Sequence, residues 1–308
     1  MRRVEPLPTA LVQLIAAENA APAGPSISAV AEAARRRHGP GIAVVLFYGS
    51  CLRGGDDVGS VVDLFLLADG YRAVHRSWLM RVFNRLLPPN VYYVEAPFDG
   101  RTVRAKYALL TLEQFERLVD PRTLQSYFWA RFAQPTVVLW ARAPAIRERI
   151  TLALATAVLT TVQETRPLLD PNAAPATVWA RAFREAYRTE LRAEAPERGG
   201  ALYQAFAGRY DRITQMINCP EPASPAEARE RRRRAERRWR RRRIVGKTLS
   251  VLRLVKSAFT FEDGASYLIW KIERHSGVRC ELTPWQKRHP ILASSALFWR
   301  IYRAGGFR

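Results

Sequence analysis

The chain has 308 residues, of which 48% are hydrophobic, enough for a sizeable buried core. Its formal net charge of +21, from 49 Lys and Arg against 28 Asp and Glu, favours an anionic partner: nucleic acid, an acidic membrane surface or a phosphorylated substrate. Three widely separated cysteines argue against a disulfide framework and a zinc site, and favour a reducing compartment. No signal-peptide pattern is present, and the uncharged stretch 150–163 is shorter than the ~20 residues that span a bilayer. We expect a soluble or peripherally bound cytoplasmic protein.

Residues 1–145 alternate between strand and helix patterns. The continuous apolar runs at 42–48 and 61–67 are typical of strands buried on both faces. Helical spacing at 75–87 puts Trp78, Val82 and Phe83 on one apolar side. Further strands are expected at 91–95, 102–110 and 136–140, and further helices within 8–36 and at 112–119 and 124–131. This mixture predicts an α/β domain over residues 1–145 with a mixed sheet.

The rest of the chain has a helical pattern. Residues 146–220 predict a packed helical domain, for which a winged-helix-like arrangement is one option. A proline-containing link, 220–225, then leads into residues 229–243, which hold eleven arginines and two acids. A basic amphipathic helix is expected from about residue 245, and a dense aromatic and basic segment at 267–302. We expect residues 221–308 to form a basic region that associates with membranes.

The arginine-rich run has three interpretations. It could be a solvated, partly helical linker. It could be attracted to anionic lipid, at roughly 1 kcal/mol per basic residue near the surface. It could also bind nucleic acid through phosphate contacts. The adjoining amphipathic helix favours the membrane interpretation.

The turn that follows the first buried strand carries the chemistry. Transfer of a nucleotidyl group needs donors for the triphosphate, carboxylates for Mg²⁺ and a cation near the reacting phosphorus. The backbone amides of Gly49 and Ser50 can point at phosphate, because glycine permits close approach and serine adds a hydroxyl. Asp63 lies within an otherwise apolar strand, where a carboxylate is costly unless a metal or partner compensates it. A strand-end aspartate that caps a neighbouring loop is the alternative.

This pattern resembles the DNA polymerase β-like nucleotidyltransferase superfamily, in which a Gly-Ser turn precedes a strand bearing aspartates. The usual second carboxylate, two positions after the first, is Phe65 here. Metal binding by two carboxylates on this strand is therefore unavailable.

A closer resemblance runs in order through about residues 43–140. The chain is similar to the mitochondrial phosphatidate cytidylyltransferases, the translocator assembly and maintenance family, whose aspartate is also followed by apolar residues. The matching pieces are Phe47-Tyr48-Gly49-Ser50, Val62-Asp63-Leu64, Asp69, Asn84, Asn90-Val91-Tyr92-Tyr93, Gly100, Lys106-Tyr107-Ala108-Leu109 and Arg131-Phe132-Ala133-Gln134-Pro135. The chain departs from the family at Cys51-Leu52-Arg53, after the Gly-Ser turn, and at Val94-Glu95, after the tyrosine pair.

The resemblance implies transfer of CMP from CTP to phosphatidic acid, which gives CDP-diacylglycerol and pyrophosphate with Mg²⁺ as cofactor. It implies that Tyr48, Gly49 and Ser50 hold CTP, with Gly49 and Ser50 on its phosphates. Asp63 would bind Mg²⁺, and Lys106 would offset charge on the triphosphate; without the resemblance Lys106 would be a surface lysine. The candidate second metal ligand is Glu95, with an exposed edge-strand glutamate as the alternative.

Two other functions stay open. One is nucleotidyl transfer to RNA or to a protein hydroxyl, and the other is a non-catalytic nucleic-acid or membrane adaptor on a transferase fold. Arginine- and alanine-rich composition fits a GC-rich bacterial genome. The expected location is therefore the cytoplasmic face of a bacterial inner membrane.

Overall fold

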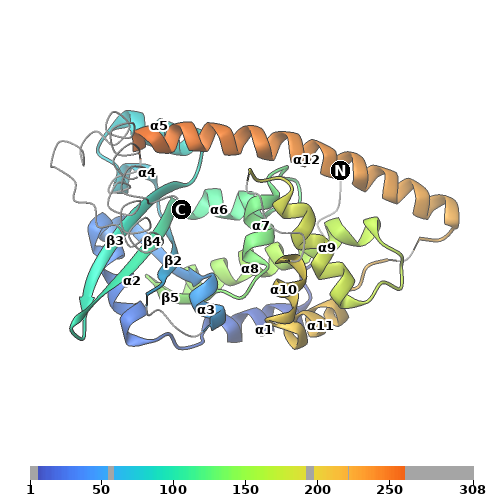
Figure 1. Cartoon of the computed structure of the whole chain (residues 1–308), viewed down its shortest axis with the longest axis horizontal. Coiled ribbons are helices and arrows are strands. Elements are labelled where there is room, and N and C mark those ends of the chain that lie inside the picture. Colours follow the sequence, from blue (N-terminus) through green and yellow to red (C-terminus); the bar gives the residue numbers. More distant parts are fainter. Residues whose placement is uncertain (1–5, 55–58, 192–197, 221, 261–308) are drawn as a thin grey trace, which may run out of the picture.

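The computed structural model describes residues 6–54, 59–191, 198–220 and 222–260. Its centre is a mixed sheet of five strands in the order β3-β4-β2-β1-β5 (Figure 1). The strands are β1 (Ile42–Tyr48), β2 (Val61–Ala68), β3 (Asn90–Phe98), β4 (Arg101–Thr111) and β5 (Val137–Ala141). Each lies where the apolar runs predicted a strand, so the α/β fold class is confirmed.

Helices make up most of the remaining described chain. They are α1 (Thr9–Asn19), α2 (Pro25–His38), α3 (Ser50–Gly54), α4 (Tyr71–Val74), α5 (Trp78–Leu86), α6 (Leu112–Val119), α7 (Ser126–Phe132), α8 (Pro144–Thr165), α9 (Pro175–Tyr187), α10 (Arg198–Gln204), α11 (Ala207–Met216) and α12 (Pro225–Thr260), with 3₁₀ turns at Gly39–Gly41 and Arg166–Leu168. After β5 the described residues contain helices and connections but no strand. The described residues after β5 therefore do not form the β-strand wing that a winged-helix arrangement requires.

The sheet separates two hydrophobic cores. On one face, α2 packs Val30 and Ala34 against Phe47 and Leu64. On the other face, α6, α7 and α8 cover a larger core that continues without a break into α9, α11 and α12. The predicted boundary at residue 145 falls in the first turn of α8, a helix that contributes to this second core.

The arginine-rich run lies in α12, a single 36-residue helix that runs along the molecule and ends beside β3 and α5 (Figure 1). It buries Trp239 and Arg242 against the larger core. The buried carboxylate of Glu164 pairs with Arg238 at 3.0 Å and with Arg242 at 2.7 Å. The solvated-linker interpretation is therefore wrong for this segment, since one face of the run is packed and paired.

Helix α5 has its polar side inside and its apolar side outside, the reverse of the usual arrangement. Its one fully buried residue is Asn84. Trp78 is 66% exposed and Leu86 is 69% exposed, and Val82 and Phe83 are also exposed. The helix was predicted correctly, but its apolar side does not face the core. The buried side instead holds the amide of Asn84 near His75, with Nδ2 and Nε2 2.9 Å apart.

Among the described helices none is both long and apolar enough to cross a membrane. Cys51 is buried, and its Sγ donates to the carbonyl of Val61 at 3.5 Å. Cys280, the aromatic and basic segment 267–302 and the glycine-rich loop acids Asp56 and Asp57 lie outside the described residues.

Candidate functional site

Four of the residues singled out by motif or strand pattern form one row across the sheet. Tyr48 on β1 pairs with Asp63 on β2, which pairs with Lys106 on β4, which pairs with Tyr93 on β3. Because directly paired residues in neighbouring strands point to the same face, all four side chains share one side of the sheet. Distant sequence motifs therefore meet at one place, the end of β1 and the beginning of β2.

Gly49 lies directly against the carboxylate of Asp63. Its φ of 96° is a left-handed conformation that side chains rarely adopt, and a Cβ added here would lie 2.7 Å from Oδ2 of Asp63. The turn therefore requires glycine for two reasons. Ser50 follows at the start of α3 and is exposed. Arg53 at the other end of α3 donates from Nη1 to Oε1 of Gln134 at 3.2 Å, which fixes the turn against the loop before β5.

Lys106 is the cation of the row. Its Nζ lies 3.5 Å from Oδ1 of Asp63, with 31% of the lysine side chain and 25% of the aspartate side chain exposed. Both groups are thus half-buried and still reachable from solvent. The expectation of a catalytic cation near Asp63 is compatible with this position.

Glu95 lies away from Asp63. It pairs with Arg104 on β4, one alternate position further along the sheet than Tyr93 and Lys106. Two strand spacings and two residues separate Glu95 from Asp63, about 12 Å between Cα atoms. Its Oε1 accepts hydrogen bonds from Tyr93 Oη at 2.7 Å and Arg104 Nε at 3.1 Å. The register therefore does not bring Glu95 to Asp63 as a second ligand of the same ion.

Phe65 explains why a second carboxylate is missing from β2. It shares the face of Asp63 but lies under α7, fully buried. Its ring centroid is 4.9 Å from that of Phe132 and 5.5 Å from that of Tyr48. A carboxylate at this position would be buried in an aromatic core, at a cost of several kcal/mol. Asp63 is therefore the one carboxylate on β2 that a metal could reach.

Arg131 is a site residue that residue-by-residue reasoning missed, although it stands in the family motif. Its guanidinium lies 4.5 Å from the ring centre of Tyr127 and 5.7 Å from that of Tyr48. Its Nη2 is 3.9 Å from Oε2 of Glu190, while its Nε is buried and makes no hydrogen bond with the described residues. The sequence signal was its place in that motif, which does not reveal that this face of α7 meets Tyr48.

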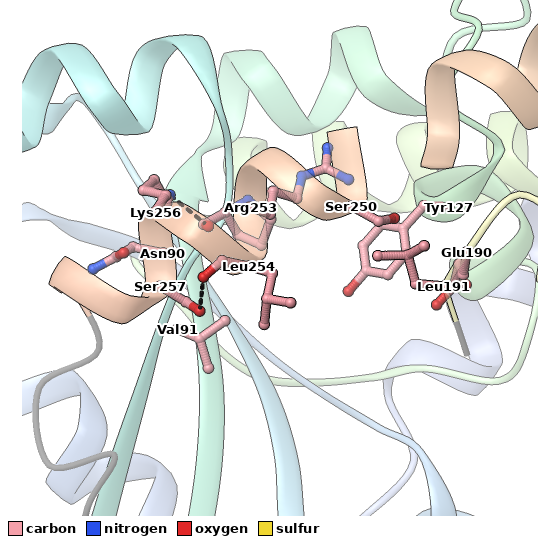
Figure 2. A pocket seen from close by; sticks show the side chains of 11 residues that line it. Asn90, Val91, Tyr127, Glu190, Leu191, Ser250, Arg253, Leu254, Lys256 and Ser257 are labelled. Atoms are coloured by element: carbon pink, nitrogen blue, oxygen red, sulfur yellow. Dashed lines mark hydrogen bonds between the residues drawn. The ribbon is translucent and has the colours of Figure 1, made fainter. Parts of the chain in front are cut away.

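A pocket of about 270 Å³ opens on the same side of the sheet, between β3, α7 and the end of α12 (Figure 2). We call it the α12 pocket. It is lined by Pro89, Asn90, Val91, Tyr127, Glu190, Leu191, Ser250, Arg253, Leu254, Lys256 and Ser257. Asp63 and Lys106 are not in its wall. Tyr127 and Glu190 line the pocket and also contact Arg131, so Arg131 lies between the α12 pocket and the Asp63 row.

Two cations of α12 fix this wall of the pocket. Arg253 donates from Nε to the carbonyl of Pro88 at 2.7 Å. Lys256 donates from Nζ to the carbonyls of Leu87 at 2.7 Å and Pro89 at 2.8 Å, and to Oδ1 of Asn84 at 2.9 Å. Burial, together with the charge of Arg253, lowers the pKa of Lys256 to about 7. A negative ligand in the pocket would therefore stabilise the charged lysine.

The donor set of the row fits a nucleotide-bound Mg²⁺ better than a cation held by protein alone. Mg²⁺ in phosphoryl-transfer sites is commonly held by one or two carboxylates together with substrate phosphates. Asp63 supplies one such carboxylate. The described residues contain no cluster of three His, Cys, Asp or Glu side chains suited to a metal.

Comparison of the sequence with protein-family models gives no match, and comparison with curated proteins gives none either.

Proposed function

We propose that this chain is a Mg²⁺-dependent nucleotidyltransferase that transfers CMP from CTP to phosphatidic acid. The observation that carries the proposal is the contact of Gly49 with Asp63 and of Asp63 with Lys106, at the open end of two paired strands. A phosphate oxygen of the lipid attacks the α-phosphorus of CTP. The bond from that phosphorus to its bridging oxygen breaks, so CDP-diacylglycerol forms and pyrophosphate leaves.

The Gly49-Ser50 turn and three residues of the row have roles in this reaction. The amides of Gly49 and Ser50 and the serine hydroxyl bind phosphate oxygens of CTP. Lys106 stabilises the charge that develops on the triphosphate. Tyr48 stays a neutral wall of the nucleotide site, because burial raises the pKa of its hydroxyl. Mg²⁺, held by Asp63 and the phosphates, would neutralise charge and align the reacting groups.

The α12 pocket is the proposed site of the acceptor's glycerol and first acyl carbons. Val91 in its wall pairs with Ala108 of β4, which pairs with Phe65 of β2, two residues along from Asp63. The strand geometry puts Val91 about 12 Å from Asp63, within reach of a lipid's glycerol phosphate. Arg131, between the two, is positioned to meet the lipid phosphate. The peripheral location on the inner face of a bacterial membrane follows from this substrate and belongs to the proposal.

A runner-up function is nucleotidyl transfer to RNA. Seven arginines on the first half of α12 have exposed side chains that could contact phosphates: Arg229, Arg232, Arg233, Arg234, Arg237, Arg240 and Arg241. Nucleotidyl transfer to a protein hydroxyl would depend on the same residues, Asp63 and Lys106. A non-catalytic adaptor is favoured only by the loss of the second carboxylate at Phe65.

The decisive experiment incubates the full chain with α-labelled CTP and Mg²⁺, in separate reactions with phosphatidic acid vesicles, RNA and a protein acceptor. We expect labelled CDP-diacylglycerol, and its loss in Asp63→Asn. Asp170→Asn is the matched control, because Asp170 is exposed and lies in the connection that leads to α9, outside the sheet.

Three other outcomes contradict the lipid proposal. Label on RNA or protein without lipid product favours the runner-up. Equal lipid product from Asp63→Asn and wild type removes Asp63 from the mechanism. No product with any acceptor, together with no rise in Tm on adding Mg²⁺ and CTP, favours the adaptor.

A further inference from the structure

The exposed side of α5 is a continuous apolar surface. At 100° per residue, its five exposed large apolar side chains fall within an arc of about 140°. They are Trp78, Leu79, Val82, Phe83 and Leu86. We call this set the α5 face. Five such residues on one nine-residue helix exceed what single scattered surface hydrophobics explain.

The polar side of the same helix is bonded inward, which holds the apolar side outward. Asn84 contacts His75 and accepts a hydrogen bond at Oδ1 from Lys256 of α12 at 2.9 Å. Gln114 of α6 donates from Nε2 to the carbonyl of Arg85 at 2.8 Å. Rotating α5 to bury its apolar side would break these bonds and bury polar groups without partners. The exposure is therefore a fixed property of the fold.

The end of α12 extends this surface. Lys256 reaches α5, and the neighbouring side chains Leu252 and Val255 are exposed. Figure 1 shows this end of α12 beside α5. The apolar surface thus combines two helices that lie far apart in the sequence.

The charge around this surface is positive. Helix α5 contains no acid, and neither does the segment 237–260 of α12. Arg72, Arg76 and Arg85 are exposed within or just before α5, and Lys247 is exposed on α12. An apolar centre with aromatic residues and a basic surround matches the acyl boundary and anionic headgroups of a bilayer.

We propose that the α5 face and the adjoining end of α12 dock the protein onto an anionic lipid bilayer. Trp78 and Phe83 insert at the headgroup and acyl boundary, and the arginines contact lipid phosphates. The α12 pocket adjoins this surface, since Leu254 lines the pocket and is itself exposed. Docking deepens the proposed function by naming the surface through which a lipid acceptor is reached, and it rests on that function only for the identity of the acceptor.

The test measures binding of the full chain to vesicles of phosphatidylcholine that contain phosphatidylglycerol as the anionic lipid. Binding is measured by co-sedimentation without CTP. Phosphatidylglycerol is used because it is not the proposed acceptor. Phe83→Glu and Trp78→Glu should each weaken binding at least about tenfold, because a charge replaces an inserted ring. Leu152→Glu is the matched control: Leu152 is 41% exposed on α8, close to the 45% of Phe83, and lies outside the α5 face. Binding should also weaken with added salt.

Several outcomes overturn the proposal. Wild type that fails to bind vesicles, or Phe83→Glu and Leu152→Glu that bind equally, removes the docking role. Concentration-dependent dimers that Phe83→Glu dissociates, without vesicle binding, assign the surface to a second copy of the chain. If the wild type does not bind vesicles and Phe83→Glu has a lower Tm than Leu152→Glu, the α5 face is instead a packing surface for residues 261–308.

The outcome for docking is separable from that for catalysis. Vesicle binding that depends on Phe83, without lipid product in the CTP assay, supports docking and contradicts the transfer reaction. Product from detergent-dispersed phosphatidic acid, without vesicle binding, overturns docking and leaves the transfer reaction standing.

Discussion

Lys106 Nζ lies 3.5 Å from Oδ1 of Asp63, and the two residues are direct neighbours across the parallel strands β2 and β4. The ammonium partly balances a carboxylate that would otherwise stand alone at the end of an apolar strand. In the proposed complex, the metal would neutralise the carboxylate of Asp63, and the ammonium of Lys106 would then interact with the phosphates of the nucleotide. The pair therefore links the unliganded fold to the proposed chemistry.

Replacing the cation should separate catalysis from nucleotide binding. Lys106→Met keeps the length of the side chain and removes its charge, so kcat should fall by about 10²-fold or more while the KM for CTP rises less. Lys106→Arg should recover part of the rate. Steady-state kinetics with varied CTP check this expectation, and a Lys106→Met enzyme with wild-type kcat would contradict it.

Glu95→Gln should have a much smaller effect than Asp63→Asn. Glu95 is bonded to Tyr93 and Arg104 and lies about 12 Å from Asp63, so it cannot share one ion with that carboxylate. We expect activity within about threefold of wild type and an unchanged Mg²⁺ requirement. A titration of rate against Mg²⁺ measures this, and a large rise in the Mg²⁺ needed by Glu95→Gln would restore Glu95 as a ligand.

Gly49→Ala should disturb the site more than the stability of the fold. The added methyl would meet Oδ2 of Asp63 at 2.7 Å and must also adopt a positive φ. Displacement of Asp63 should cost about tenfold or more in kcat/KM. Gly100→Ala is a useful comparison: Gly100 also has a positive φ, of 70°, but nothing lies near its added Cβ. Equal losses for the two variants would mean that backbone strain alone is responsible.

Ser250→Trp should fill the α12 pocket and weaken use of the acceptor. Ser250 lines the pocket, and its hydroxyl donates to the carbonyl of Gly246 at 2.8 Å. We expect the KM for phosphatidic acid to rise about tenfold and the KM for CTP to stay unchanged. Thr156→Trp is the control, because Thr156 donates to the carbonyl of Leu152 four residues back in the same way and is also half-buried, but lies on α8 outside the pocket. Identical kinetics for the two variants would place the acceptor elsewhere.

Two histidines, the buried His75 and the half-buried His38, should make the fold sensitive to acid. Burial lowers the pKa of His38 and of His75 to about 4, assisted by neighbouring positive groups. Since the unfolded chain binds these protons near pH 6.5, their stabilising contribution is complete above that pH and is lost as the pH falls towards 4. His75→Gln should lose less stability over this window, by on the order of 1 kcal/mol after allowing for partial exposure. Urea unfolding between pH 7 and 4 tests this, and parallel curves would contradict it.

Local patterns in the sequence predicted the strands well. The run 42–48 is apolar throughout and the run 61–67 is apolar except for Asp63, because helices cover both faces of the sheet there. Asp63 stands out for this reason. The register between β2 and β4 was not predictable, because it pairs segments more than forty residues apart, such as those of Asp63 and Lys106. That is why Lys106 could be tied to Asp63 only through the family resemblance, and why Glu95 was expected closer than it lies.

Orientation of the helices was the weakest part of the prediction. Spacing along α5 defined an apolar side correctly, but spacing cannot tell whether that side meets the core. Buried hydrogen bonds from Asn84 decided the matter. Arg131 was missed as a site residue for a related reason, since its contacts with Tyr48 exist only after α7 packs on the sheet.

The length of α12 has a consequence for the order of assembly. Its 36 residues extend about 54 Å and bring the last described residues of the chain back to β3, which is encoded much earlier. The Asp63 row is complete once β4 and α7 are made, whereas the wall of the α12 pocket arrives with residues 250–257. Chains fold from the N-terminus during synthesis. A nascent or shortened chain would therefore form the proposed CTP site before it forms the proposed acceptor pocket.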